Sequence, residues 1–270
     1  MPDDLSTAAS AAEQVSPARM YDYLLGGTNN YAVDRAAAAE GMKYDPDIRA
    51  VAVANRSFLK RAVRYVAEQG ITQFLDVGTG LPTEENVHEI AQSVAPNART
   101  VYVDNDPNVL PLAQALIVGD EQTRYIEADL RDPHGILTHP VTVRHLDHSQ
   151  PWCLVLCSVL HFVPDADDAY GVVYRLMDAM PPGSYMIFTH ASSTDIDPRL
   201  QEIVTRTNAR LRVPITYRPI EDIARFLDHP GWEMVQPGLV DVQRWQPEKV
   251  SDDDATSYTI RVMAGVAVRR

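Results

Sequence analysis

The segment Phe74-Leu-Asp-Val-Gly-Thr-Gly-Leu-Pro-Thr83 decides the fold. Its apolar first half predicts a strand over 73–77, and glycines 78 and 80 predict a tight turn before a helix over 84–94. Glycine lets the backbone adopt positive φ and come close to a ligand. Ligands of open parallel sheets bind beyond the carboxyl ends of the strands, where this turn must lie. Glycine also serves ordinary strand-to-helix turns, so the turn alone is a weak signal.

Strands and helices alternate after this turn. Strands are predicted at 100–103, 124–128, 152–158 and 184–189, and helices at 108–117 and 167–180. The strand at 152–158 is apolar almost throughout, which is typical of a strand buried on both faces. Between two of the strands, residues 132–150 are rich in Pro and His and predict a loop. The alternation predicts an α/β fold whose parallel sheet is covered on both faces.

The end of the chain breaks the alternation. Residues 221–227 predict a helix, and two strand-like runs at 233–245 and 257–268 follow with no helix between them. An acidic loop over 248–254 joins these runs. They predict an antiparallel hairpin at the edge of the sheet.

The N-terminal part predicts a tail and then helices. Residues 1–15 are rich in Ala, Ser and acidic residues and predict a disordered tail. Ser16-Pro17 is a helix start, and Gly26-Gly27 ends that helix. Further helices are predicted over 34–41 and 47–69.

The length and composition favour one globular domain. The chain has 270 residues, of which 45% are hydrophobic and 23% charged, close to the average for globular proteins. We assign residues 16–270 to a single domain, with an N-terminal helical lid over 16–70 and a core over 71–270.

Net charge and cysteine content limit the partners and the compartment. A net charge of −13 argues against binding to nucleic acid or to an anionic membrane surface. Cys153 and Cys157 are expected to be buried thiols in a reducing compartment. The N-terminus lacks the features of a signal peptide, and no apolar stretch approaches the ~20 residues of a membrane span. We expect a soluble, cytoplasmic protein.

A carboxylate stands at the end of three successive predicted strands: Asp76, Asp104 and Asp129. A single Asp in such a place is usually a cap or a turn former, but three at one edge indicate a ligand. The second carboxylate can accept hydrogen bonds from ribose hydroxyls, and the third from an adenine amino group.

The surroundings of the glycine turn indicate which nucleoside fits. Glu84 and Glu85, together with Asp76, would repel the pyrophosphate that a dinucleotide brings to this helix start. The same charges favour a ligand with a sulfonium and an ammonium group. Pro82 stands where the dinucleotide fingerprint approaches its third glycine. Both features favour S-adenosylmethionine over NAD.

These features resemble a class I S-adenosylmethionine-dependent methyltransferase, and more narrowly the S-adenosyl methyltransferase family found mostly in actinobacteria. The resemblance covers nearly everything from residue 16 to residue 270. Its marks are Ser16-Pro-Ala-Arg-Met-Tyr-Asp-Tyr-Leu-Leu-Gly-Gly27, Asn55-Arg-Ser-Phe58, residues 154–164 and Pro237-Gly-Leu-Val240. The resemblance implies a three-layer, Rossmann-like α/β fold with a seven-stranded, mostly parallel sheet and an antiparallel last strand. It implies S-adenosylmethionine as the cofactor and supplies no substrate.

The positions that match the family imply which residues line the cofactor. Those implied for the methionyl part and the transferable methyl group are Gly78, Thr79, Gly80 and Ser158. Those implied for the ribose and the adenine are Asp104, Asn105, Asp129 and Leu130. Pro82 departs from the commoner glycine, so the path of the turn stays open.

The predicted lid contributes three more candidates. Arg19 is a candidate to clamp the cofactor carboxylate through two parallel hydrogen bonds. Tyr21 and Tyr23 either pack on the bound cofactor or only pin the lid to the domain. Asn55-Arg56 either supports the lid or is an ordinary helix surface.

A general base is needed only when the methyl acceptor must lose a proton. His161, in Ser158-Val-Leu-His-Phe-Val-Pro164, is the first candidate and His190 the second. The alternative interpretation, to which we give more weight, is that each is a histidine of the pocket wall or the core that forms a hydrogen bond with the backbone.

Two clusters carry weaker predictions. Four histidines within 132–150 lack the partner set of a zinc site, so no metal is predicted. Five arginines fall within twenty residues: Arg199, Arg206, Arg210, Arg212 and Arg218. They indicate an anionic acceptor or, with more weight, a solvated helix face.

The sequence therefore predicts a methyltransferase that acts on a small molecule. One alternative is a module that binds S-adenosylmethionine as a sensor, because no catalytic base is unmistakable. The other is an NAD-dependent oxidoreductase on a similar sheet, which the terminal hairpin and the acidic turn disfavour.

Overall fold

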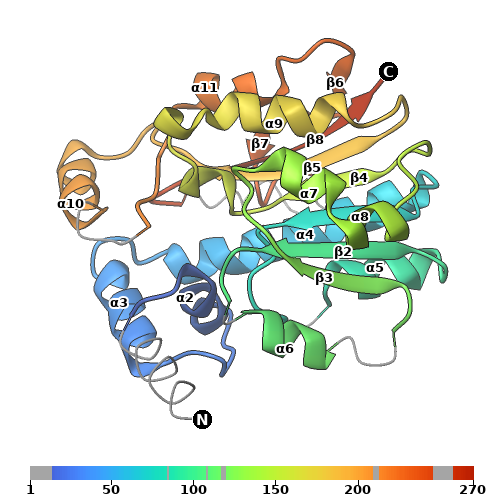
Figure 1. Ribbon diagram of the computed structural model, residues 1–270. Coiled ribbons are helices and arrows are strands. Elements are labelled where there is room, and N and C mark those ends of the chain that lie inside the picture. Colours follow the sequence, from blue (N-terminus) through green and yellow to red (C-terminus); the bar gives the residue numbers. More distant parts are fainter. Residues whose placement is uncertain (1–13, 84, 108, 117–119, 209–212, 246–257) are drawn as a thin grey trace.

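The computed structural model describes the chain except for residues 1–13, 84, 108, 117–119, 209–212 and 246–257. Most of the predicted tail and the whole predicted acidic loop at 248–254 lie outside the described residues. The centre of the fold is an eight-stranded sheet in the order β3-β2-β1-β4-β5-β8-β6, with β7 pairing with β8 off this path (Figure 1).

The five N-terminal strands are parallel to one another, and β8 is antiparallel to β5, β6 and β7. The strands are β1 (Gln73–Val77), β2 (Arg99–Asp104), β3 (Thr123–Glu127), β4 (Cys153–Leu156), β5 (Tyr185–Ala191), β6 (Trp232–Met234), β7 (Val240–Asp241) and β8 (Val262–Arg269). This arrangement confirms the predicted α/β fold with a mostly parallel sheet and an antiparallel C-terminal strand.

The predicted antiparallel hairpin at the edge of the sheet is confirmed, because β6 and β8 pair antiparallel there. The strand β8 lies inside the sheet, between β5 and β6, so β6 forms the edge. Its successive side chains Met263, Ala264, Val266 and Ala267 are all buried, which requires cover on both faces of the strand. The predicted run over 233–245 is two short strands, which gives eight strands in place of seven.

Helices cover both faces of the sheet and complete three layers (Figure 1). On one face, α4 (Ile48–Glu68) and α5 (Val87–Val94) pack on alternate strand residues such as Phe74 and Val155. On the other face, α7, α9 and α11 pack on the intervening residues such as Leu75 and Leu154. The helices that follow α5 along the chain are α6 (Val109–Leu116), α7 (Pro133–Thr138), α8 (Pro140–His145), α9 (Ala169–Asp178), α10 (Pro198–Asn208) and α11 (Ile220–Ala224).

Two helix predictions need correction. The predicted loop over 132–150 contains α7 and α8, because Asp132 and His139 cap helices that each begin with Pro. The helix predicted from residue 84 begins at Val87, where Asn86 and Glu89 form a capping box. None of the helices in the described residues is long and apolar enough to cross a membrane.

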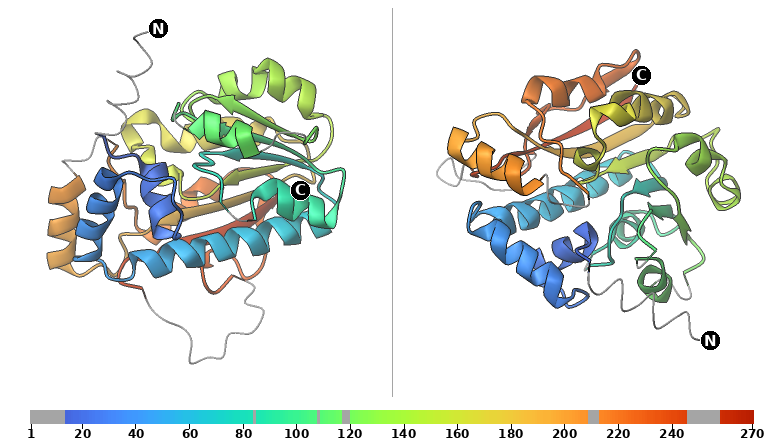
Figure 2. Two further views of the ribbon diagram at one scale, coloured as in Figure 1. Left: turned by 90° about the horizontal axis from the view of Figure 1, so that it is seen from below. Right: turned by 60° about the vertical axis from the view of Figure 1, so that its left-hand side comes forward.

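The N-terminal helices α2 (Pro17–Leu24) and α3 (Ala32–Met42) lie together at one end of α4 (Figure 2). Ser16 caps α2 by accepting from the amide of Arg19, as the sequence predicts. The predicted lid over 16–70 also includes α4, whose Phe58 and Val63 are buried in the core. The covering part of the predicted lid is therefore α2 and α3.

Candidate functional site

The turn after β1 places its glycines at the carboxyl ends of the strands, here called the rim. Gly78 and Gly80 have φ of +75° and +65°. A Cβ at Gly78 would lie 2.2 Å from Cγ2 of Val159, so the loop after β4 packs on this turn. Among the described residues, a Cβ at Gly80 would meet only Ala18 of α2 within 4 Å, at 3.9 Å. The turn is thus tight on the β4 side and open toward α2.

The carboxylate of Asp104, at the end of β2, bends back toward this turn. Its Oδ2 accepts from the amide of Gly80 at 2.7 Å, and its Oδ1 accepts from the amide of Asp106 at 2.9 Å. Burial raises the pKa of Asp104 above its usual value, and the two amides oppose that rise. The structure therefore brings Asp104 and the glycine turn together.

Asp129, after β3, lies in a separate polar group. Arg131 donates to both carboxylate oxygens, from Nε at 3.0 Å and from Nη2 at 2.6 Å, and Asn105 donates from Nδ2 at 3.0 Å. These bonds lower the pKa of Asp129 to about 2, and those from Arg131 contribute most. Leu130, the next residue, is buried in the core. Arg131 was not a candidate in the sequence. It and Asn105 already donate hydrogen bonds to both carboxylate oxygens of Asp129.

Asp76 is buried at the end of β1. Burial raises its pKa to about 7, the charge of Arg56 opposes this rise, and Thr79 donates to its Oδ2 at 3.3 Å. The carboxylate lies beneath the turn, and none of the described residues forms an ion pair with it. The expected repulsion of phosphate by Glu85 is weaker than predicted, because Lys60 forms an ion pair with Glu85. Glu84 lies outside the described residues.

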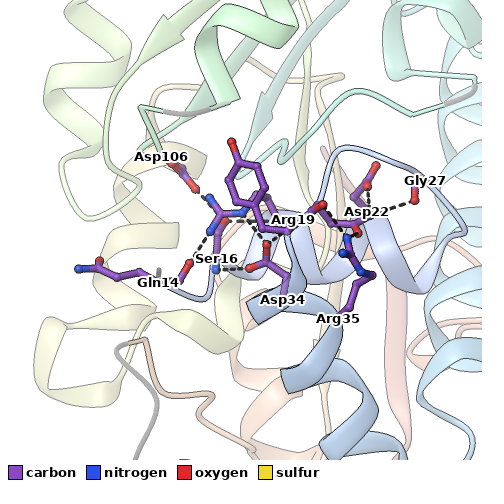
Figure 3. Close-up of polar contacts among 10 residues, drawn as sticks. Gln14, Ser16, Arg19, Asp22, Gly27, Asp34, Arg35 and Asp106 are labelled. Atoms are coloured by element: carbon purple, nitrogen blue, oxygen red, sulfur yellow. Dashed lines mark hydrogen bonds and ion pairs between the residues drawn. The ribbon is translucent and has the colours of Figure 1, made fainter. Parts of the chain in front are cut away.

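The helix α2 is docked on the rim through its first residues. Ser16 donates from Oγ to Oδ2 of Asp106, in the loop after β2, at 2.8 Å. Arg19 forms an ion pair with Asp34 of α3, with Nε and Oδ2 2.7 Å apart, and both side chains are buried (Figure 3). The guanidinium also lies over the ring of Tyr31, 4.7 Å from its centre. This ion pair occupies part of Arg19, so its contact with a cofactor carboxylate remains a prediction.

Tyr21 lies at the rim and Tyr23 does not. The hydroxyl of Tyr21 accepts from Nδ2 of Asn55 at 2.8 Å and donates to the carbonyl of Ala52 at 3.1 Å. The same hydroxyl lies near the side chain of Ser158, and burial raises the pKa of Tyr21 to about 12. Tyr23 instead packs among α2, α3 and α4, with the guanidinium of Arg49 5.2 Å from its ring centre.

Ser158 follows β4 with a φ of +55°, which is unusual for a residue other than glycine. Its amide donates to Oγ1 of Thr189 on β5 at 2.8 Å. A strained backbone held at a strand end is typical of functional positions. The structure places Ser158 in the loop after β4, and its contact with the transferable methyl group remains a prediction.

His161 lies in a short 3-10 turn, Leu160–Phe162, beyond the rim. Its side chain is buried, and Nδ1 has no hydrogen-bond partner among the described residues. Burial, with a smaller effect of Arg218, lowers the pKa of His161 to about 4. The ring is therefore neutral at pH 7, with a nitrogen that can accept a proton.

Arg218 binds that turn from a distant part of the chain. It is buried and donates to the carbonyls of Leu160 and Val163, to Nε2 of His190, and to the carboxylate of Asp165. The prediction that Arg218 faces solvent or an anionic acceptor is therefore wrong. Arg210 and Arg212 lie outside the described residues.

Other polar features of the described residues do not form a competing centre. No three His, Cys, Asp or Glu side chains gather as metal ligands in this part of the chain. His139 caps α8, and Nε2 of His145 lies 2.7 Å from the carbonyl of Gln122. A shallow hollow of about 480 Å³, lined by Arg99, Arg144 and His148, lies at the opposite, amino ends of the strands.

The groups at the rim fit S-adenosylmethionine. Because Gly80 has no side chain, the space between its Cα and Ala18 of α2 is left open for a ligand. Oδ1 of Asn55 is a buried acceptor without a partner among the described residues. Asp76 and Asp104 add carboxylate acceptors at adjacent strand ends. Acceptors are what the ammonium, ribose and adenine amino groups of this cofactor require.

Comparison with known proteins gives one consistent result. A sequence profile described as S-adenosyl methyltransferase matches residues 6–270. A crystal structure from Thermobifida fusca YX, described as a candidate methyltransferase, shares 39% identity, covers 96% of this chain and 97% of its own, and superimposes with a TM-score of 0.88. A DUF574 family protein from Streptomyces avermitilis MA-4680 shares 39% identity over 96% of this chain and 99% of its own, with a TM-score of 0.89.

More distant similarity concerns the fold alone. An O-methyltransferase family protein from Burkholderia thailandensis shares 15% identity over 81% of this chain and 60% of its own, with a TM-score of 0.51. None of the curated proteins matches the sequence.

Proposed function

Since the chain belongs to the S-adenosyl methyltransferase family, we propose that it transfers the methyl group of S-adenosylmethionine to a small-molecule acceptor. The family establishes the cofactor and the type of reaction, and the acceptor is our proposal. The observation that carries it is the position of α2 over the rim, where Ala18 faces Gly80 and Ser16 bonds Asp106. A rim covered so closely favours a small acceptor over a macromolecule.

We assign the cofactor to the strand ends as the sequence predicts. The residues proposed to hold its methionyl part and methyl group are Asp76, Gly78, Thr79, Gly80 and Ser158. Those proposed to hold the ribose and adenine are Asp104, Asn105, Asp129 and Leu130. In the covering helix, Arg19 is proposed for the cofactor carboxylate and Tyr21 for packing on the bound cofactor, whereas Tyr23 packs among the N-terminal helices and is left out. When bound, S-adenosylmethionine supplies a methyl group on a positively charged sulfur, which is already electrophilic. The protein therefore has to align the acceptor and exclude water.

His161 is the residue proposed to accept a proton from the methyl acceptor. Its lowered pKa keeps it neutral at pH 7, and its buried Nδ1 has no partner in the described part of the chain. It stands three residues after Ser158, beside the rim. His190 is a poor alternative, because Nε2 accepts from Arg218 and Nδ1 bonds the carbonyl of Ala191.

The structure limits what is proposed about partners. An anionic acceptor is not part of the proposal, because Arg218 is buried and paired with Asp165. The net charge of −13 supports a function without nucleic acid. Free thiols at Cys153 and Cys157 support a reducing compartment.

Binding followed by turnover tests this function. We expect calorimetry to detect binding of S-adenosylmethionine and S-adenosylhomocysteine, and not of NAD or ATP. We expect a labelled methyl group to pass from S-adenosylmethionine to a compound in a metabolite extract. Cofactor binding without any labelled product would favour the sensor alternative, and binding of NAD alone would contradict the cofactor assignment.

A further inference from the structure

The hydrogen bonds of the Tyr21 hydroxyl fix the orientation of the side-chain amide of Asn55. The hydroxyl donates to the carbonyl of Ala52 at 3.1 Å and accepts from Nδ2 of Asn55 at 2.8 Å. A hydroxyl has one proton to donate, and the carbonyl of Ala52 takes it, so the hydroxyl can only accept from Asn55. Nδ2 of Asn55 must therefore face Tyr21, and Oδ1 must point elsewhere.

This orientation leaves Oδ1 of Asn55 as a buried acceptor. The side chain is only 4% exposed, and none of the described residues donates a hydrogen bond to this oxygen. Buried polar atoms in folded proteins almost always have partners, because an unsatisfied one is destabilising. A ligand that brings a donor would account for the position.

Asn55 lies at the junction of β1 and β4. Ser158, whose side chain lies near the same hydroxyl, is in the loop after β4, and its neighbour Val159 packs on Gly78. Asp76 of β1 pairs in register with Val155 of β4, so its buried carboxylate belongs to the same junction. The strands β2 and β3 lie on the far side of β1. The unpartnered acceptor is therefore separated from the strand ends assigned to the ribose and adenine.

We propose that Oδ1 of Asn55 accepts a hydrogen bond from the ammonium group of S-adenosylmethionine, with Tyr21 holding the amide in that orientation. This inference rests on the proposed function, which assigns the ribose and adenine to β2 and β3. The ammonium group is the donor of the cofactor that remains for β1 and β4. Asp76 supplies a second buried acceptor at this junction. One hydroxyl of the covering helix thus connects that helix to cofactor recognition.

Three ligands separate this contact from the rest of the cofactor site. S-adenosylhomocysteine has both the ammonium and the carboxylate, S-adenosyl-3-thiopropylamine has the ammonium alone, and 5′-methylthioadenosine has neither. For Asn55→Leu, we expect calorimetry to show ~10–100-fold weaker binding of the first two and about unchanged binding of the third. Ser57→Ala, on the exposed side of the same helix, is the matched control and should leave all three affinities unchanged.

Two further variants protect the test from a folding defect. Tyr21→Phe keeps the amide and frees it to rotate, so we expect a smaller loss, about 3–10-fold, confined to the two ammonium ligands. Asn55→Asp keeps an acceptor oxygen and should bind these two ligands at least as tightly as the wild type does.

Each outcome decides between the proposals. If Asn55→Leu, folded by its thermal melt, binds all three ligands as the wild type does or loses them equally, the inference is overturned and the proposed function stands. If Asn55→Leu does not fold, the ligand pattern of Tyr21→Phe and Asn55→Asp decides in the same way. A wild-type protein that binds none of the three overturns the proposed function itself.

Discussion

Arg218 donates a hydrogen bond from Nη1 to Nε2 of His190 over 2.7 Å, and both side chains are buried. Because a guanidinium can only donate, Nε2 must be the unprotonated nitrogen of the ring. The proton then lies on Nδ1, which donates to the carbonyl of Ala191 at 2.8 Å. This pair fixes one neutral tautomer of His190 and ties β5 to the turn that carries His161.

Replacement of Arg218 should therefore destabilise the fold. Arg218→Leu leaves the carbonyl of Val163 and Nε2 of His190 without their donor, whereas the carbonyl of Leu160 keeps the amide of Val163. A buried group that loses its partner costs ~1–3 kcal/mol, so we expect a loss of at least ~2 kcal/mol in the free energy of unfolding. Urea denaturation measures this loss. Arg225→Ala is the control, because its ion pair with Asp222 is exposed, and a similar loss there would contradict the assignment.

The ring of His161 should remain neutral across the physiological range. Burial lowers its pKa to about 4, below the 6.5 of an ordinary histidine. Since the unfolded chain binds a proton between these values and the folded chain does not, His161 reduces stability as the pH falls through this window. In a histidine NMR titration, the signal that disappears in His161→Gln should not shift between about pH 5.5 and 8. A midpoint near the ordinary histidine value would contradict the burial of this ring in the folded protein.

Asp76 should make stability depend on pH in a defined direction. Burial raises its pKa from 3.8 to about 7, so the folded chain holds a proton that the unfolded chain has lost. The free energy of unfolding therefore falls as the pH rises from about 4 to about 7. We expect Asp76→Asn to gain stability relative to the wild type over this window, by up to ~4 kcal/mol at about pH 8. Urea denaturation at several pH values measures the gain.

Asp129→Asn provides a control of opposite sign. Arg131 lowers the pKa of Asp129 to about 2, so this carboxylate stabilises the fold above its unfolded value and loses that effect as the pH falls toward 2. Both partners are partly exposed, so the loss in the variant should be below ~1 kcal/mol at neutral pH. A difference between Asp76→Asn and the wild type that is the same at every pH would refute the role of burial.

Local patterns predicted the elements that depend on local chemistry. The strand and turn around Gly78, the cap at Ser16 and the carboxylates at the strand ends all follow from short-range rules. The two helices within 132–150 were missed because Asp and Pro signal both a loop and a helix start. The correct reading depended on which residues become buried, and Ile136 is fully buried.

Contacts between distant segments were beyond the reach of those rules. Arg218 meets Asp165 across 53 positions of sequence, and burial turned a presumed surface arginine into part of the core. Tyr21 and Asn55 were both candidates, yet only the fold shows that they share one hydrogen bond. The pairing of Lys60 with Glu85 likewise weakened a charge argument that counted acidic residues alone.

Removal of the Asp104 carboxylate should weaken the cofactor site at its ribose end. Its oxygens accept from the amides of Gly80 and Asp106, so the carboxylate is held between the glycine turn and the loop after β2, at the strand end to which the ribose is assigned. We expect Asp104→Ala to reduce the calorimetric affinity for S-adenosylhomocysteine by ~1–3 kcal/mol. The paired residue in register on β3 is Glu127, and it is exposed, so Glu127→Gln should bind normally. Equal affinities for Asp104→Ala and the wild type, with the fold verified by thermal melting, would remove the ribose from the end of β2.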